Sequence, residues 1–140
     1  MQCIWGPHFA IDGELQTSYG KIFISNTENY PWFEVELSHL TKISSVTIYN
    51  RPDCCGERFK NVQVRAGRVN GVTSKNQMIG LFQGPGKTGH ELVIQFKATV
   101  NAEYMSFQII GRKAFMQING IKINKVNATS EYFFYLFLSL

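Results

Sequence analysis

The sequence predicts an all-β domain with the two packed layers of a β-sandwich. Its 140 residues correspond to about one domain, on the usual scale of ~100 to 200 residues per domain. Aromatic residues make up 14 % of the chain, and together with the valine and isoleucine content they favour strands over helices. Apolar and polar residues alternate repeatedly with period two, and no long segment has a clear helical period. A single globular sandwich is therefore expected, and a two-domain enzyme with a cleft between its halves is not.

Several segments have the composition of strands, and clusters of glycine, proline or asparagine separate them. Most of these segments alternate apolar with polar residues, which predicts strands with one buried and one solvated face. The predicted strands are 32–37, 43–49, 59–65, 78–83, 91–96, 104–110 and 116–123. The cluster at 84–89 lacks the first glycine of a phosphate-binding loop, so it is interpreted as a hairpin loop between two strands. Short strands at this regular spacing are typical of a β-sandwich.

Charge and motif content argue against several function classes. The net charge of +4 comes from basic residues spread over the chain, which indicates a mildly basic surface rather than a nucleic-acid site. His8, His39 and His90 stand far apart, with no cysteine or carboxylate at metal-ligand spacing, and are interpreted as surface or turn residues. No nucleophile, metal cluster or acid pair emerges from the sequence, so an enzyme is not expected.

Both ends of the chain depart from the domain pattern. The apolar run at 132–138 is much shorter than the ~20 residues that span a bilayer, so no transmembrane span is expected. The start of the chain does not have the composition of a secretory signal. Asn127 begins a glycosylation sequon, which has meaning only in a secreted protein. Residues 8–124 are expected to form the domain, and 1–7 and 125–140 are interpreted as atypical ends, from truncation or an error in the gene model.

One loop between two predicted strands, at 49–59, concentrates charged residues and cysteines. Loops on a rigid sheet are where binding groups usually lie. Arg51 and Arg58 each offer five N–H donors in a fixed fork, which suits sugar hydroxyls or anionic oxygens, and Asp53 could hold a guanidinium in position. This loop is the candidate binding site, and a solvated charged loop is the alternative interpretation.

The same loop contains the adjacent cysteines Cys54 and Cys55. Neighbouring Cα atoms lie ~3.8 Å apart, below the usual ~4.4 to 6.8 Å of disulfides, so a bond between them closes a strained ring of about eight atoms. Oxidised, the pair is a stiff apolar plate that can pack on the face of a sugar. Reduced, it is two small thiols. Cys3 is the third cysteine, so one cysteine must remain unpaired within the chain.

These residues resemble the F-type lectins, a fucose-binding family related in fold to the discoidin or coagulation-factor C-type domains. The matching segments are 10–13 (AIDG), 31–37 (PWFEVEL) and 46–58 (VTIYNRPDCCGER), with a looser match at 115–124. The resemblance implies a jelly-roll β-sandwich whose first strand is almost absent before His8. It also implies a secreted lectin whose partners are fucosylated glycans or glycoproteins, and a homo-oligomer is a further expectation.

The resemblance implies a role for each residue of the loop. Arg51 and Arg58 would donate hydrogen bonds to the sugar, Asp53 would support them, and a disulfide between Cys54 and Cys55 would pack on the sugar ring. Such a disulfide implies an oxidising, extracellular compartment. The related discoidin-like fold offers an alternative function, an adhesion module that binds a protein or an anionic lipid surface.

Two sets of positions depart from the family pattern. Counting back from the first arginine places the family's sugar-binding histidine at Ile24, and an apolar residue there removes a hydrogen-bonding group at a cost of ~1 to 3 kcal/mol. Fucose binding is therefore expected to be weakened or altered. The family's structural Ca²⁺ retains Asp12 as a candidate ligand, but Asn119 and Gly120 occupy the later ligand positions. The calcium site is expected to be eroded.

Overall fold

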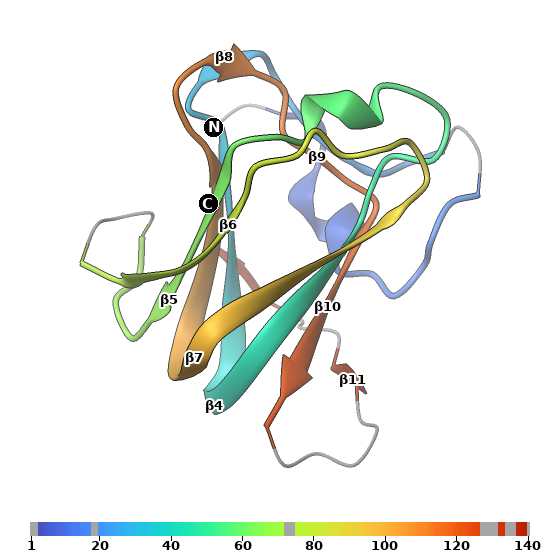
Figure 1. The fold of residues 1–140 in the computed structure, drawn as a ribbon. Helices are drawn as coiled ribbons and strands as arrows, with labels where there is room; N and C mark the ends of the chain where they lie inside the picture. The colour runs from blue at the N-terminus through green and yellow to red at the C-terminus, as the bar shows by residue number, and fades with distance from the viewer. Residues whose placement is uncertain (1–2, 18–19, 72–74, 127–131, 134–136, 140) are drawn as a thin grey trace.

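The computed structural model describes residues 3–17, 20–71, 75–126, 132–133 and 137–139. Strands and two short 3-10 helices, η1 and η2, build this part of the chain, which confirms the predicted all-β sandwich (Figure 1). The elements are β1 (Cys3–Trp5), η1 (Pro7–Ala10), β2 (Phe23–Ser25), β3 (Glu28–Asn29), β4 (Trp32–Tyr49), η2 (Gly56–Arg58), β5 (Val62–Gly67), β6 (Gln77–Phe82), β7 (Glu91–Ile109), β8 (Lys113–Ala114), β9 (Gln117–Ile118), β10 (Gly120–Lys125), β11 (Tyr132–Phe133) and β12 (Phe137–Ser139).

Most strands belong to one bent sheet, in the order β11-β10-β4-β7-β5-β6, with β12 also paired to β4. The antiparallel strands β4 and β7 pair from Trp32 opposite Gln108 to Tyr49 opposite Glu91. Both bend at the lower end of Figure 1, so this one pair of strands contributes to both layers of the sandwich. A smaller sheet has the order β1-β2-β9, and β3 pairs with β8.

The structure has two long strands where the sequence predicts four shorter ones. The predictions at 32–37 and 43–49 are the two halves of β4, and those at 91–96 and 104–110 fall within β7. The exposed residues 38–40 interrupt the alternation, but they form no hairpin turn. The β4–β7 register shifts twice near this point, and such irregularities bend a strand without ending it.

The core lies between the layers, where the inward side chains of β2, β4 and β7 meet. Phe23, Phe33 and Phe107 are fully buried. The ring centroids of Phe23 and Phe33 are 5.0 Å apart, and those of Phe33 and Phe107 are 6.2 Å apart. Tilted ring pairs of this kind stabilise a fold by ~0.5 to 1.5 kcal/mol beyond the area they bury. This row of rings joins the small sheet to the large one.

Strand pairing extends to both ends of the described chain. β1 lies before the predicted domain start at His8 and pairs with β2. β10 runs to Lys125, and β11 and β12 pair with β10 and β4. The predicted sequon at Asn127 lies outside the described residues, and the domain limits 8–124 stay a prediction. No helix in the described ranges has the length and apolar content needed to cross a bilayer.

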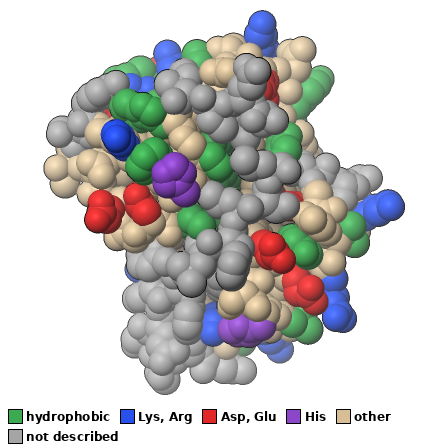
Figure 2. Space-filling view, turned by 180° about the vertical axis from the view of Figure 1, so that it is seen from behind, with side chains coloured by type: hydrophobic (Ala, Val, Ile, Leu, Met, Phe, Trp, Pro, Cys, Tyr) green, Lys and Arg blue, Asp and Glu red, His purple; other side chains and the backbone are tan. Residues whose placement is uncertain are grey.

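The charged side chains are mixed over the surface. On the face seen in Figure 2, lysine and arginine are interspersed with acidic residues and do not gather into one basic patch. His8, His39 and His90 are all exposed, as the sequence predicts. The basic net charge therefore has no single location on this face.

We expect Phe107→Ala to lower the free energy of unfolding by about 3 to 5 kcal/mol, because the cavity left by a buried ring is only partly refilled. Urea denaturation measures this change. Val93, in the same strand and 61 % exposed, provides the control, since Val93→Ala should change stability by less than about 0.5 kcal/mol. Equal effects of the two substitutions would contradict a core centred on Phe107.

Candidate functional site

The candidate loop leaves β4 at one end of the sandwich and runs through η2 into β5 (Figure 1). The buried side chain of Asn50 fixes its shape. Asn50 Nδ2 donates hydrogen bonds to the carbonyl oxygens of Gly56 at 2.9 Å and Lys87 at 3.0 Å. Asn50 Oδ1 accepts a hydrogen bond from the backbone N–H of Arg51 at 2.9 Å. One amide side chain thus links the start of the loop, its end and a second segment of the chain.

That second segment, 84–90, lies against the loop. The prediction of a hairpin loop at 84–89 is wrong. β6 pairs with β5, and β7 pairs with β4 and β5, so the strands that flank the segment are not neighbours. Thr88 Oγ1 accepts a hydrogen bond from Gly56 N–H at 3.0 Å, and Gly89 N–H donates to the carbonyl of Arg51 at 2.8 Å. A Cβ at Gly56 would collide with the backbone of Thr88. This close approach requires glycine at position 56.

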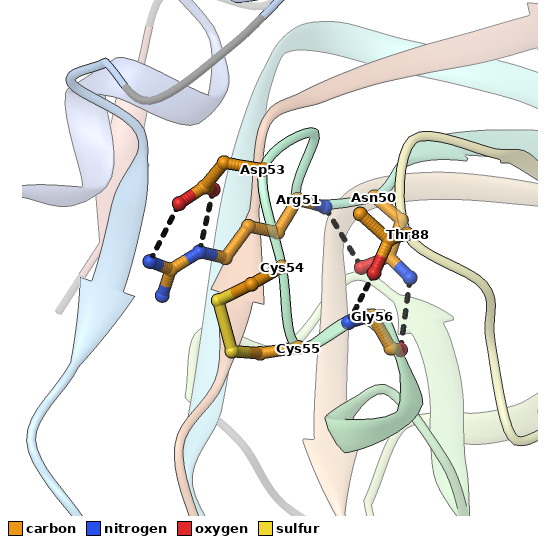
Figure 3. The surroundings of a disulfide bond; sticks show 7 residues. All are labelled: Asn50, Arg51, Asp53, Cys54, Cys55, Gly56 and Thr88. Carbon is orange, nitrogen blue, oxygen red and sulfur yellow. Dashed lines mark hydrogen bonds and ion pairs between the residues drawn. A yellow bond between two sulfur atoms is a disulfide. The ribbon is translucent and has the colours of Figure 1, made fainter.

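Arg51 and Asp53 form a two-point ion pair. Arg51 Nε donates to Asp53 Oδ1 at 2.8 Å, and Nη2 donates to Oδ2 at 3.1 Å. Their side chains are 12 % and 21 % exposed. The hydrogen bond from Arg51 holds the pKa of Asp53 below its ordinary value of 3.8. The paired contact fixes the plane of the guanidinium, which Figure 3 shows directed toward the pale blue strand β2.

Cys54 and Cys55 form a disulfide, with an S–S distance of 2.08 Å and Cα atoms 3.7 Å apart. Both residues are half-buried. In Figure 3 the two sulfur atoms lie beside the side chain of Arg51. Cys55 has the left-handed φ of 65° and forms the N-cap of η2. The oxidised form of the cysteine pair therefore places an apolar plate next to the fixed guanidinium.

Arg58, at the end of η2, lies over the ring of Phe115, with Cζ 4.8 Å from the ring centroid. Arg112 supports this part of the loop, since its Nη2 donates to the carbonyl oxygens of Arg58 at 2.6 Å and Lys60 at 3.2 Å. Burial lowers the pKa of Arg112. Phe115 falls in the weakly matching segment 115–124, and the sequence contains no signal that links either residue to the loop.

The remaining predicted positions lie outside the loop. Ile24 is buried in β2. Asp12 is exposed in the turn after η1, where its Oδ1 accepts a hydrogen bond from Glu14 N–H at 2.9 Å. The structure brings Arg51, Asp53, Cys54, Cys55 and Arg58 together on one loop, and the sugar-binding roles assigned to them stay predictions.

The side chain of Asn119 is hydrogen-bonded to the turn after Asp12. Asn119 Oδ1 accepts a hydrogen bond from Gln16 N–H at 3.0 Å, and Asn119 Nδ2 donates to the carbonyl of Gln16 at 3.0 Å. Both polar atoms of the Asn119 side chain are therefore engaged by the backbone of Gln16. No three His, Cys, Asp or Glu side chains cluster as possible metal ligands within the described residues.

A pocket of about 340 Å³ lies between the loop and this turn. Tyr49 and Pro52 line it on the loop side, and Leu15 and Asn119 line it on the other. Neither Arg51 nor Arg58 is among its lining residues. The pocket is therefore a neighbour of the ion pair and the disulfide, separate from the surface they form.

Comparison with known proteins supports the same fold. Residues 9–107 match the F5/F8 type C family model described as NedA-like, galactose-binding domain. The chain is 44 % identical to Fucolectin-1 of Anguilla japonica over 73 residues, which are 49 % of this chain and 41 % of that protein. It is 38 % identical to Fucolectin of Anguilla anguilla over 88 residues, which are 58 % of this chain and 56 % of that protein. The chain thus spans about half the length of these curated relatives.

Solved structures have the same architecture. A fucolectin from the serum of Morone saxatilis superposes with a TM-score of 0.79 at 23 % identity, over 86 % of this chain and 42 % of that one. The lectin domain of Lectinolysin, solved with Lewis B antigen, has a TM-score of 0.72 at 21 % identity, over 89 % of this chain and 88 % of that one. At these identities the likeness establishes the fold. Because the family model covers most of its residues, this chain belongs to the F5/F8 type C family of discoidin-like domains.

Proposed function

We propose that this domain is a lectin domain that binds L-fucose in glycans through the loop of Arg51, Asp53, Cys54, Cys55 and Arg58. The observation that carries the proposal is the two-point ion pair of Arg51 and Asp53 beside the disulfide. It supplies a charged donor of fixed orientation next to a rigid apolar surface. Curated relatives named fucolectins support fucose as the sugar.

Fucose presents both kinds of surface that this loop offers to a ligand. Its hydroxyl oxygens accept hydrogen bonds from guanidinium N–H groups, and bonds to charged donors are the stronger ones. Its methyl group and the C–H face of its ring are apolar and can pack on the disulfide. Arg58 adds a second cation, held over Phe115. Shallow sites of this kind bind single sugars weakly, so several copies acting together would raise the avidity.

The proposed activity is binding, without a catalytic step. A disulfide that matters for binding needs an oxidising compartment, so the proposal includes an extracellular location. The expected homo-oligomer stays a prediction. The alternative of an adhesion module on anionic lipid requires a basic patch, and the mixed charges of Figure 2 do not favour one on that face.

We expect Arg51→Ala and Arg58→Ala each to reduce the affinity for L-fucose by about 10- to 150-fold. Each removes a charge-assisted hydrogen bond worth ~1.5 to 3 kcal/mol. Isothermal titration with fucose measures the loss, and a glycan array tests whether fucosylated glycans are preferred. Arg68→Ala is the matched control, because the Arg68 side chain is 69 % exposed and pairs with Glu103.

Unchanged affinity in both loop variants would contradict the proposal. Salt-sensitive adsorption of the wild type to anionic vesicles, without competition from fucose, would favour the adhesion module instead.

Fucose affinity should also depend on pH through Asp53. The pKa of Asp53 lies below 3.8 because Arg51 donates to it, so its carboxylate supports Arg51 at all higher pH values and loses this role as the pH falls through that pKa. Asp53→Asn should weaken binding up to about fivefold at pH 7, in line with a partly exposed pair worth ~0.2 to 1 kcal/mol. The wild-type affinity should fall below pH 3.8 more steeply than that of the variant. Glu57→Gln, on the same loop, is the control, and parallel pH profiles for Asp53→Asn and wild type would contradict this role.

We further infer that Asn119 holds the turn after Asp12 in place of a calcium ion. The support for this is the pair of hydrogen bonds from one side chain to both backbone groups of Gln16. Asn119 is itself buried, so its donor and acceptor satisfy groups that burial would otherwise leave unpaired. These hydrogen bonds join Asn119 directly to the turn, as a cation bound by both would join them.

Calcium removal should therefore leave the thermal unfolding temperature unchanged. A bound ion stabilises the folded state, and more so the tighter it binds. If EDTA lowered the unfolding temperature and added calcium restored it, the inference would be contradicted. Asn119→Ala should lower the free energy of unfolding by about 1 to 3 kcal/mol, because it leaves the backbone N–H and C=O of Gln16 without these hydrogen bonds. Asn101→Ala, at an exposed position of β7, is the control and should change stability by less than about 0.5 kcal/mol.

A further inference from the structure

Gln117 of β9 is buried without a hydrogen-bond partner. The residue is 3 % exposed, and among the described residues neither Oε1 nor Nε2 has a partner. Buried polar atoms are paired in the great majority of native structures. An amide whose oxygen and nitrogen both lack partners therefore needs an explanation. A ligand that supplies the missing hydrogen bonds is one explanation.

The side chain of Gln117 lies on the face of the small sheet that points away from the core. Its neighbour Ile118 pairs with Phe23, and both belong to the core cluster. Gln117 pairs with Ile24, and neither of these two belongs to that cluster. Because successive residues of a strand face opposite sides and paired residues share a side, Gln117 and Ile24 lie together on the outer face.

This outer face continues across all three strands. Ile24 pairs on its other side with Trp5 of β1, so Trp5, Ile24 and Gln117 form one row. We call this row the strand row. Trp5 is half-buried and lies outside the core cluster. An aromatic ring and an aliphatic side chain thus precede the amide along the sheet.

The strand row lies beside the arginine loop. Phe115 stands two residues before Gln117. Met116 and Ile118 belong to the core cluster, and Phe115 and Gln117 do not, so the latter two lie on the side away from the core. Phe115 carries the guanidinium of Arg58 at 4.8 Å. Arg51 is directed toward β2, the strand of Ile24 (Figure 3). The loop and the strand row are therefore neighbours, and Ile24 and Gln117 of the row are buried.

We propose that Gln117 is a specificity-determining residue of the fucose site, where it hydrogen-bonds a pair of neighbouring sugar hydroxyls. The proposal rests on the proposed function. An amide both donates and accepts, so it can bond one hydroxyl through Nε2 and another through Oε1. Ile24 has no hydrogen-bonding side chain for this task. Ile24 is itself buried, so the half-buried Trp5 is the more exposed apolar residue of the strand row.

Contact with a ligand requires the amide to turn outward from its buried rotamer. Glutamine has three side-chain torsions, and the buried rotamer makes no hydrogen bond with the described residues that would have to break. The ligand then selects a rotamer in which both amide groups are paired. Because the amide has no hydrogen bond with the described residues in the unbound domain, the change of rotamer breaks none of these bonds.

The test compares Gln117→Met with wild type by isothermal titration against methyl α-L-fucoside and its monodeoxy analogues. Methionine keeps the length of the side chain and removes the amide, and Gln117→Leu is the second variant if Gln117→Met unfolds. We expect affinity for the fucoside to fall about 5- to 150-fold. The unfolding temperature should stay the same or rise, since an unpaired buried amide has been removed. Gln77→Met, at an exposed position of β6, is the matched control and should bind as wild type does.

The analogues separate direct contact from a structural effect. If Gln117 bonds a given hydroxyl, the analogue that lacks it should bind wild type and variant equally, as in a double-mutant cycle. An equal loss for every analogue would overturn the proposal. So would wild-type affinity in Gln117→Met while Arg51→Ala and Arg58→Ala lose affinity, a result that leaves the proposed function intact. A wild type that does not bind fucose would overturn both.

Discussion

The candidate site depends on the hydrogen bonds of one buried side chain, Asn50. The loop carries two arginines and an acid, and its buried apolar residue, Phe59, lies at its far end. Asn50 bonds the loop at Arg51 and Gly56 and bonds the segment 84–90 at Lys87. Because these bonds lie away from water, breaking one strands a buried group at a cost of ~1 to 3 kcal/mol. The charged surface of the loop is thus held by neutral hydrogen bonds beneath it.

This arrangement explains how a weak ion pair can matter. Partly exposed pairs such as Arg51 and Asp53 add little to stability, typically ~0 to 1 kcal/mol. Their proposed effect on binding is different, because a guanidinium already held in one orientation loses less entropy when a ligand binds. The disulfide of Cys54 and Cys55 limits the same short stretch of backbone. The loop therefore contributes more to the order of the site than to the stability of the fold.

The sequence predicts the loop well and its support poorly. Arg51, Asp53, Cys54, Cys55 and Arg58 are close in the chain, so their spacing alone brings them together. Thr88 and Phe115 come from distant segments, and no local pattern reports a long-range contact.

The strands show the same limit. Period-two alternation places most of β5 and β10, and the short apolar segment at 78–83 places most of β6. Neither pattern says which strands are neighbours, so 84–89 is misread as a hairpin loop. It also divides β4 and β7, because residues at a bend leave the alternation without leaving the sheet. β1 and β2 of the small sheet are missed because strands of three residues are too short to show a period.

The two departures from the family pattern have a common physical theme. Asn119 binds both backbone groups of Gln16 where a calcium ligand is expected, and Gln117 lies beside Ile24, where a histidine is expected. In both proposals a neutral amide takes the place of a group whose state depends on metal or protons. An amide has no titration near neutral pH, unlike histidine with its ordinary pKa of ~6.5. The pKa of Asp53 lies below 3.8, so this carboxylate keeps its charge from mildly acidic to neutral pH. A lectin built this way would hold its ligand across that range, where a histidine-dependent site would change.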